Sequence, residues 1–203
     1  MESKRQEYFS VFREISKDIL STLDLKEVLK SIVEQVTRAM EAKGSTLRLL
    51  DERKRTLELV AAYGLSETYL HKGPIDAEKS VAEALQGRAV AVLDATTDPR
   101  VEYPQAAREE GIASILSVPL IVREKVIGVL RLYTDTPRVF SREEIEFVSA
   151  LAEQSAIAIE HARLYEQVRE DYTTLMNDFY LWFESREQPV VSGPGTGEQS
   201  RLG

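Results

Sequence analysis

Two apolar segments near the middle of the chain constrain the fold most strongly. Residues 114–122 and 126–133 are both rich in β-branched and other apolar side chains, and the polar turn Arg123-Glu124-Lys125 joins them. Each segment is apolar on both faces over most of its length, which is typical of central strands covered by helices on each side. The pair therefore predicts a central hairpin in an α/β domain, with helices on both faces of its sheet.

The remaining elements follow from the spacing of apolar residues. Residues 3–23 and 25–40 show the three- and four-residue spacing of amphipathic helices, with Asp24 as the N-cap of the second and Gly44 at its end. Two short β-compatible runs then predict a second hairpin. The other expected elements are strands at 46–50 and 56–63, a loop or short helix at 64–73, a helix at 80–86, a strand at 89–93 and a polar helix at 104–110.

The last helix has the clearest start signal in the sequence. Ser141 and Glu144 form a capping box, and Phe140 and Ile145 occupy the positions of a hydrophobic staple. Apolar residues then recur every seven residues, which indicates a seam that another helix covers. We expect a homodimer whose interface combines the first and last helices through Tyr8, Phe12, Ile15, Ile19, Leu151, Ala158, Tyr165, Val168, Tyr172, Leu175, Phe179 and Trp182.

These signals divide the chain into four parts. An amphipathic helix at 1–20 precedes a domain at 21–165, and the last helix extends beyond it over 166–187. Residues 188–203 are dominated by Pro, Gly, Ser and Thr without an apolar period, so we expect a disordered tail.

Composition excludes several classes of function. The chain has 203 residues, with 26 Lys and Arg against 34 Asp and Glu, so its net charge of -8 disfavours nucleic acid as a partner. It has no Cys, which excludes disulfides, thiolate metal sites, iron–sulfur clusters and cysteine nucleophiles. No apolar run is long enough for a membrane helix and the N-terminus does not resemble a secretory signal. We expect a cytoplasmic protein without a metal site.

Several stretches together resemble the GAF domain family of sensory and regulatory modules. They are STLDLKEVL at 21–29, GRAVAVLD at 87–94 followed by Asp98-Pro99-Arg100, SVPL at 117–120, VIGVL at 126–130 and the closing helix from Phe140 to Tyr165. The resemblance implies an α/β fold with a central antiparallel sheet of about five to six strands. It places the N- and C-terminal helices on one face, and the helices and loops of a small-molecule pocket on the other.

The resemblance also implies binding rather than catalysis, with ligand occupancy relayed through terminal helices to a separate effector, often in a dimer. Members that attach pigments or reduce free methionine sulfoxide mostly depend on Cys, so both activities are excluded here. Members that bind cyclic nucleotides usually carry a signature that contains Asn. The only Asn here is Asn177, beyond the resembling region, so a cyclic nucleotide is a disfavoured ligand but is not excluded. No effector domain is recognised after Tyr165, which indicates a stand-alone module.

Arg48 and Arg131 interrupt otherwise apolar strands and are the leading candidates for a binding site. Strand alternation places each on one face of its strand, and neighbouring strands would bring both guanidiniums into one pocket. They could then hold a carboxylate or phosphate bidentately. The alternative is that they extend to solvent or pair with Glu58.

The loop from Asp94 to Tyr103 supplies the other candidates. Its polar groups could orient a ligand, but Asp and Thr before Pro are also ordinary turn formers. The full predicted ligand set is Arg48, Tyr63, Asp94, Asp98, Arg100, Tyr103, Arg131 and Tyr133. His71 and His161 are interpreted as a loop residue and a helix-interface residue, and no Gly-x-Ser-x-Gly or His-Glu-x-x-His motif is present.

The sequence thus predicts a homodimeric sensory module that binds a small molecule and signals to a separate protein partner, without nucleic acid or membrane. The alternative is an interaction module whose pocket is filled by its own side chains. Neither the ligand nor a cofactor is identified by the residues.

Overall fold

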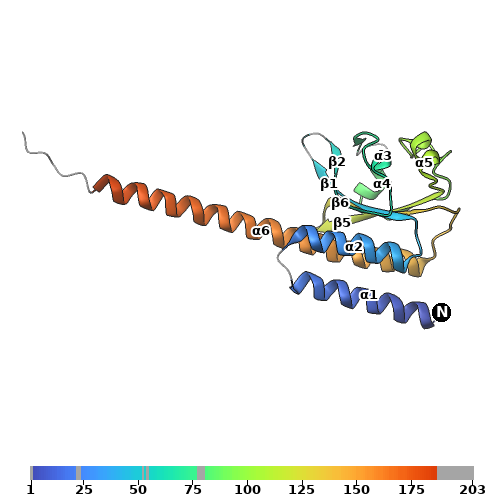
Figure 1. Ribbon diagram of the computed structural model, residues 1–203, viewed down its shortest axis with the longest axis horizontal. Helices are drawn as coiled ribbons and strands as arrows, with labels where there is room; N and C mark the ends of the chain where they lie inside the picture. The colour runs from blue at the N-terminus through green and yellow to red at the C-terminus, as the bar shows by residue number, and fades with distance from the viewer. Residues whose placement is uncertain (1, 22–23, 52, 54, 77–80, 187–203) are drawn as a thin grey trace, which may run out of the picture. The chain divides into compact units, whose positions relative to one another are not determined.

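A six-stranded antiparallel sheet organises the chain in the order β3-β2-β1-β6-β5-β4 (Figure 1). The computed structural model describes residues 2–21, 24–51, 53, 55–76 and 81–186. The strands are β1 Gly44–Asp51, β2 Thr56–Tyr63, β3 Ile75–Asp76, β4 Val90–Val92, β5 Ser114–Val122 and β6 Lys125–Thr134. The helices are α1 Glu2–Ser21, α2 Leu25–Ala39, α3 Glu67–Leu70, α4 Ala82–Leu85, α5 Pro104–Glu110 and α6 Arg142–Arg186. The predicted α/β fold is confirmed.

The central hairpin of β5 and β6 is buried on both faces, as its apolar pattern predicted. It pairs from Ser114 with Thr134 to Val122 with Lys125. Leu130 and Leu132 pack into the core shared with the terminal helices, whereas Val129 and Tyr133 pack on the opposite side. Figure 1 shows α1, α2 and α6 on one side of the sheet and α3, α4 and α5 on the other.

The helical layer includes α1, which packs within the same unit as the sheet. The Tyr8 ring stacks on Phe147 of α6 with ring centroids 4.1 Å apart. Four of the residues expected at a dimer interface are buried inside this one chain: Tyr8, Ile15, Leu151 and Ala158. Phe12 and Ile19 are partly buried against the same core. In this structure these side chains stabilise the chain's own fold.

The end of α2 differs from the prediction. The N–H of Ala42 donates to the Thr37 carbonyl at 2.9 Å and that of Glu41 to Arg38 at 3.0 Å, which is a Schellman motif with Glu41 in the left-handed region at φ 47°. Gly44 does not end the helix but begins β1. A Cβ at Gly44 would lie 2.6 Å from the Tyr63 carbonyl oxygen, so close packing against β2 requires glycine there.

The start of α6 confirms the capping box. The N–H of Glu144 donates to Ser141 Oγ at 3.2 Å, and the N–H of Ser141 donates to Glu144 Oε2 at 2.8 Å. The Glu144 carboxylate also pairs with Arg138, whose Nη1 donates to the Met40 carbonyl at 2.5 Å. This cluster ties the start of α6 to the end of α2.

The shorter elements match the predictions in kind. The helix at 104–110 is confirmed, the region 64–73 contains α3, and the 89–93 run contains β4. The helix expected at 80–86 is reduced to α4, and residue 80 lies outside the described residues. β3 was not predicted, because two residues are too short to show a period.

Contacts divide the chain into two compact units, Met1–Arg163 and Leu164–Gly203. In the second unit α6 continues to Arg186, and the predicted tail at 188–203 lies outside the described residues. The six seam residues of this unit are each more than half exposed: Tyr165, Val168, Tyr172, Leu175, Phe179 and Trp182. None of the described helices has the length and apolar content needed to cross a membrane.

Candidate functional site

Arg48 and Arg131 lie on the same face of the sheet, in adjacent strands. β1 and β6 pair so that Thr46 stands opposite Arg131 and Arg48 stands opposite Val129. The two arginines are therefore diagonal neighbours on the side of the sheet that carries α3 and α5. Both are buried, with 3% of Arg48 and 4% of Arg131 exposed. The predicted adjacency is confirmed, and the role in ligand binding stays a prediction.

The guanidiniums of Arg48 and Arg131 do not reach solvent, so the alternative that these side chains extend to solvent is wrong. Arg48 Nη1 donates to the Leu57 carbonyl at 3.3 Å, while its Nε and Nη2 are buried without a hydrogen-bond partner. Arg131 Nε donates to Ser117 Oγ at 3.2 Å. Glu58 stands opposite Leu49 rather than Arg48, so its side chain leaves the sheet on the other face.

Aromatic side chains surround the two arginines. The Tyr133 hydroxyl lies 3.1 Å from Thr46 Oγ1, and the Tyr69 ring meets the Tyr133 ring edge-on with centroids 5.7 Å apart. Burial raises the pKa of Tyr69, and the nearby Tyr133 adds to that shift. Burial lowers the pKa of Arg48, and the proximity of Arg131 lowers it further, against an opposing effect of Tyr133. The site thus places two buried cations near aromatic rings, with the Arg131 guanidinium 5.7 Å from the centroid of the Tyr133 ring.

Lys72 is a third cation at this site, and sequence reasoning missed it. Its Nζ lies 3.5 Å from the centroid of the Tyr69 ring and donates to the Tyr69 carbonyl at 3.0 Å. Burial, followed by repulsion from Arg48 and Arg131, lowers its pKa to about 7. Lys72 follows α3 in a loop without an apolar period, so no local pattern in the sequence marks it. Its role depends on its position beside the strand arginines, which only the tertiary structure shows.

A small cavity lies beside these groups. Its walls come from α3, the following loop, the start of α5 and the sheet, and its lining residues are Tyr69, Lys72, Ile75, Val101, Glu102, Tyr103, Ile115 and Arg131. The free space inside is about 10 Å³, enough for roughly one water molecule. Arg48 does not line this space. A larger guest therefore needs movement of the cover formed by residues 66–74.

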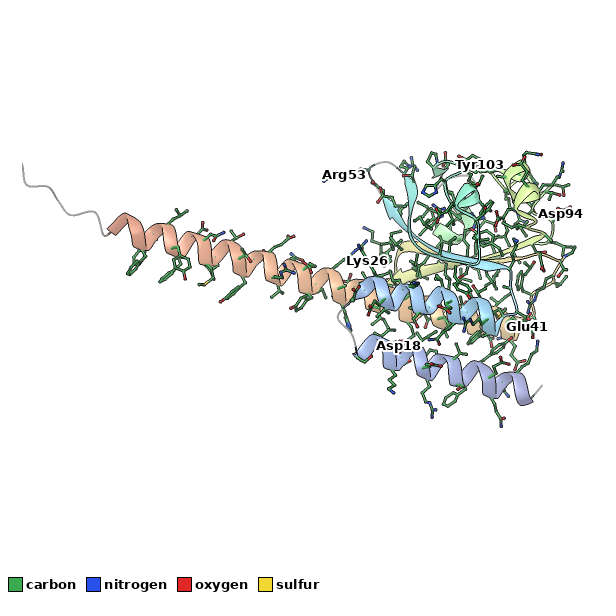
Figure 2. All side chains as sticks on the ribbon, in the orientation of Figure 1. Asp18, Lys26, Glu41, Arg53, Asp94 and Tyr103 are labelled. Atoms are coloured by element: carbon green, nitrogen blue, oxygen red, sulfur yellow. The ribbon has the colours of Figure 1, made fainter. Side chains whose placement is uncertain are left out.

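Tyr103 is the predicted loop residue that reaches the cavity. Its hydroxyl donates to the Pro74 carbonyl at 2.7 Å, which joins the start of α5 to the cover. Figure 2 shows Tyr103 on the side of the sheet opposite to Asp18 of α1. The backbone N–H of Asp76 donates to Glu102 Oε2 at 3.0 Å, a second link across the same rim.

Tyr63 does not join the site, contrary to the prediction. It stands opposite Ser45, whose hydroxyl donates to Val33 of α2, so Tyr63 faces the helical layer. Its own hydroxyl accepts from Arg38 Nη2 at 3.5 Å. A register shift in the pairing of β1 with β2 reverses which face the later residues of β2 occupy, and places Tyr63 away from the arginines.

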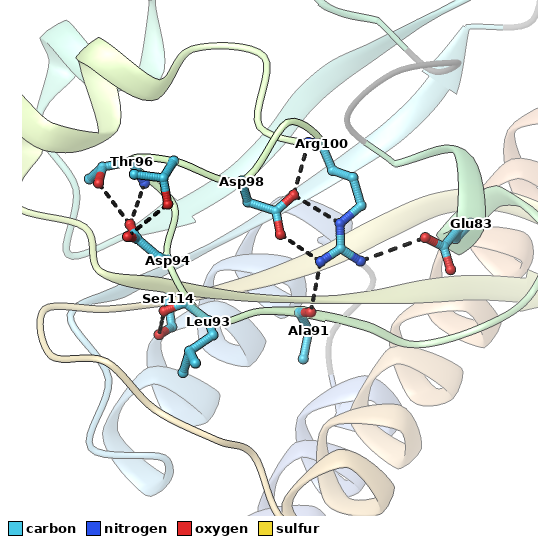
Figure 3. A network of polar contacts seen from close by, with 9 residues as sticks. Glu83, Ala91, Leu93, Asp94, Thr96, Asp98, Arg100 and Ser114 are labelled. Carbon is cyan, nitrogen blue, oxygen red and sulfur yellow. Dashed lines mark hydrogen bonds and ion pairs between the residues drawn. The ribbon is translucent and has the colours of Figure 1, made fainter.

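Asp94, Asp98 and Arg100 form a separate surface network (Figure 3). Asp94 accepts hydrogen bonds from the Thr96 N–H at 2.9 Å and the Thr96 hydroxyl at 2.7 Å, and the Thr96 hydroxyl is the main cause of its lowered pKa. Arg100 Nε and Nη2 donate to the two oxygens of Asp98 at 2.9 and 2.6 Å, and Nη1 lies 3.6 Å from Glu83. None of the three lines the cavity, so they act here as turn formers.

The histidines stay outside the site. His71 is exposed, with Nδ1 2.9 Å from the Glu67 carbonyl, and His161 is exposed on α6. Within the part of the chain that the structure describes, three or more potential metal ligands never gather in one place.

The antiparallel sheet thus carries the terminal helices on one face, and short helices and loops over a small cavity on the other. The sequence model of the GAF domain family matches residues 22–160. The chain belongs to the GAF domain family, whose members serve as sensory and regulatory modules in kinases and transcriptional regulators.

Curated relatives match this chain over only part of their own length. The "Phosphoenolpyruvate-dependent phosphotransferase system" protein of Escherichia coli is 27% identical over 75% of this chain and 21% of its own length. The "Circadian input-output histidine kinase CikA" of Thermosynechococcus vestitus is 25% identical over 85% of this chain and 26% of its own. The chain spans about a quarter of the length of these relatives.

Solved structures show the same fold. The GAF domain from a phosphoenolpyruvate-protein phosphotransferase of Coxiella burnetii superimposes with a TM-score of 0.72 at 22% identity, over 80% of this chain and 98% of that domain.

Proposed function

We propose that this chain is a sensory module that binds a small anionic molecule between Arg48 and Arg131. The observation that carries this proposal is the buried guanidinium of Arg48, whose Nε and Nη2 have no partner. Burying an unpaired charged donor is costly, whereas a carboxylate or phosphate oxygen would satisfy both atoms with charge-assisted hydrogen bonds. The second guanidinium, on the same face, would hold the other side of such an anion.

The electrostatic setting supports an anion rather than a neutral ligand. Among the described residues, neither arginine forms an ion pair with a carboxylate, although the chain as a whole carries a net charge of -8. Surface arginines such as Arg38, Arg100 and Arg142 each have an acidic partner within 4 Å. Positive charge without local compensation at a buried position is the pattern expected of a site that receives a negative ligand.

We infer binding rather than catalysis. The cavity lining includes guanidinium, ammonium and phenol donors, which can hold and orient an anion, together with the Glu102 carboxylate. The chain has no Cys to act as a nucleophile. This assignment agrees with the regulatory role that is usual in the family.

The signalling part of the proposal concerns the helices. β6 carries Arg131 and leads through residues 135–141 to α6, whose distal part exposes an apolar seam. A ligand that favours one arrangement of β6 and α6 would change how α6 pairs with a second copy, and so inform a separate protein partner in the cytoplasm. The ligand must bind the two arrangements with different affinity for this coupling to exist.

One observation favours a second candidate function. The cavity has room for about one water molecule, as expected if its own side chains fill the pocket permanently. In that case the chain would act as a dimerisation and protein-interaction module without a ligand.

Thermal unfolding in the presence of carboxylates and phosphates distinguishes the two functions. An anion present at a hundred times its dissociation constant should add about 2.7 kcal/mol to the free energy of unfolding. We expect Arg131→Gln to abolish this stabilisation, while Arg100→Gln, at an exposed arginine outside the cavity, leaves it intact. If no anion stabilises the unaltered protein, the interaction module is the better account.

A further inference from the structure

Lys72 adds a third positive charge to a site whose strands already supply two. Its Nζ lies over the Tyr69 ring and donates to the Tyr69 carbonyl, so the partly buried ammonium is held against the cover. Together with Arg131 it lines the cavity. No carboxylate of the described residues lies within ion-pair distance of Lys72.

Two cations and one carboxylate line the cavity, namely Arg131, Lys72 and Glu102, and Arg48 is the diagonal neighbour of Arg131 outside the wall. Glu110 of α5 also acts on the charge of Lys72, and its carboxylate accepts from the Ser66 N–H and hydroxyl. When Lys72 is protonated, the three cations outnumber the two carboxylates.

We propose that Lys72 contacts the ligand as a third cation, and that the site therefore selects oxyanions with two negative charges over singly charged carboxylates. This inference rests on the proposed anion site of Arg48 and Arg131. An oxyanion with two charges can accept charge-assisted hydrogen bonds from a strand arginine and from Lys72 at the same time, whereas the single charge of a carboxylate would be shared between them. Sulfate, inorganic phosphate and small dicarboxylates share the required chemistry.

Lys72 belongs to the cover, which would have to move for a ligand to enter the cavity. The cover at residues 66–74 is attached by the Ser66 contacts to Glu110 and by the bond from Tyr103 to Pro74. Tyr69 also anchors the cover, because its ring is buried against Tyr133 in the core on this side of the sheet. Because Lys72 belongs to the cover, an anion bound to the strand arginines would draw Lys72 back over itself and close the site.

The pH dependence of anion binding is a second test of the role of Lys72, because binding should be coupled to protonation of this side chain. The groups facing Lys72 are Arg48 of β1, Arg131 of β6, Tyr69 of α3, and Glu102 and Glu110 from the loop and helix of α5. The two arginines and burial keep its pKa near 7, and a bound anion would raise it again. Affinity for an anion of constant charge should therefore fall as the pH rises above 7.

Calorimetric titration of the full chain with sulfate and with acetate tests the inference, since sulfate keeps its two charges across this range. We expect the unaltered protein to prefer sulfate. Lys72→Gln should weaken sulfate binding about tenfold and change acetate binding little. Lys72→Arg should keep sulfate binding and remove its loss at high pH. Lys26→Gln, at an exposed lysine of α2, is the matched control.

The outcomes separate the inference from the function on which it rests. Equal affinity for sulfate and acetate, or equal losses of both in Lys72→Gln, would overturn selection by Lys72 and leave the anion site standing. If neither anion binds the unaltered protein, both proposals fail. A sulfate preference that disappears only in Lys72→Gln supports both.

Discussion

Arg48 and Arg131 are diagonal neighbours across β1 and β6, and both are buried on the same face of the sheet. Such a pair of like charges is unfavourable in the absence of a counterion, because each cation is removed from water and repels the other. The structure thus keeps a costly arrangement at the position where the proposed ligand would compensate it.

Replacing one of these arginines should stabilise the ligand-free protein. Arg48→Met keeps a long side chain but removes the buried charge and its two unpaired donors, so we expect the free energy of unfolding to rise by about 1–3 kcal/mol. Chemical denaturation measures this change. Arg13→Met, at an exposed position of α1, should have little effect, and a loss of stability in Arg48→Met would contradict the proposed cost.

The stability of the ligand-free protein should depend on the ionisation of Lys72. The folded state holds its pKa at about 7, well below the ordinary value of 10.5, so the unfolded state binds more protons between these values. Stability should therefore increase as the pH rises from 7 towards 10.5 and stay low below 7. Lys72→Met should remove this increase and gain about 1–2 kcal/mol at pH 7, after discounting for partial exposure. Denaturation of both proteins across this range provides the comparison, and parallel curves would refute the assignment.

The start of α6 should depend on Glu144 more than on its neighbour. Burial alone would raise the pKa of Glu144, but the Arg138 side chain and the Ser141 N–H outweigh it, and the net shift is downward. The ionised carboxylate thus stabilises the fold at neutral pH, and this contribution is lost as the pH falls below the usual range of a carboxyl group. Glu144→Gln should cost about 1–3 kcal/mol at pH 7 in thermal or chemical unfolding. Glu143→Gln, at an exposed residue paired with Arg5, should cost far less.

The exposed seam of α6 should control self-association. Leu175 belongs to the seven-residue repeat and is 67% exposed, so a second copy of the helix would bury it. We expect Leu175→Asp to convert a dimer into a monomer in light-scattering measurements. Asn177→Asp adds the same charge two residues away, off the seam, and should leave the dimer intact. A monomeric unaltered protein at high concentration would remove the dimer from the proposal.

Local signals in the sequence were sufficient for much of the fold. The apolar pattern of 114–133 predicted the central hairpin and its coverage by helices, and Ser141 with Glu144 predicted the start of α6. These features depend on residues a few positions apart, so their spacing alone reveals them. Gly44 shows the limit of such signals, since its role depends on Tyr63 of the neighbouring strand.

The sequence predicted only some of the residues at the candidate site. Arg48 and Arg131 stood out because charge is rare in apolar strands, but Tyr63 was assigned to the site without knowledge of the register shift in β2. Leu57 and Leu59 precede that shift, and Tyr63 follows it on the opposite face. One extra residue in β2 reverses which face of the sheet the following side chains occupy, and no local sequence pattern predicts it.

The sequence by itself determined which residues form strands and helices, and it showed that two cations interrupt an apolar sheet. Only the tertiary structure decided that these cations are adjacent, that Lys72 joins them, and that Tyr8 and Ile15 stabilise the chain's own core. The physical reason is that helical and strand periods are properties of neighbouring residues, whereas strand register and the closure of a loop over a sheet are fixed by packing between distant parts of the chain.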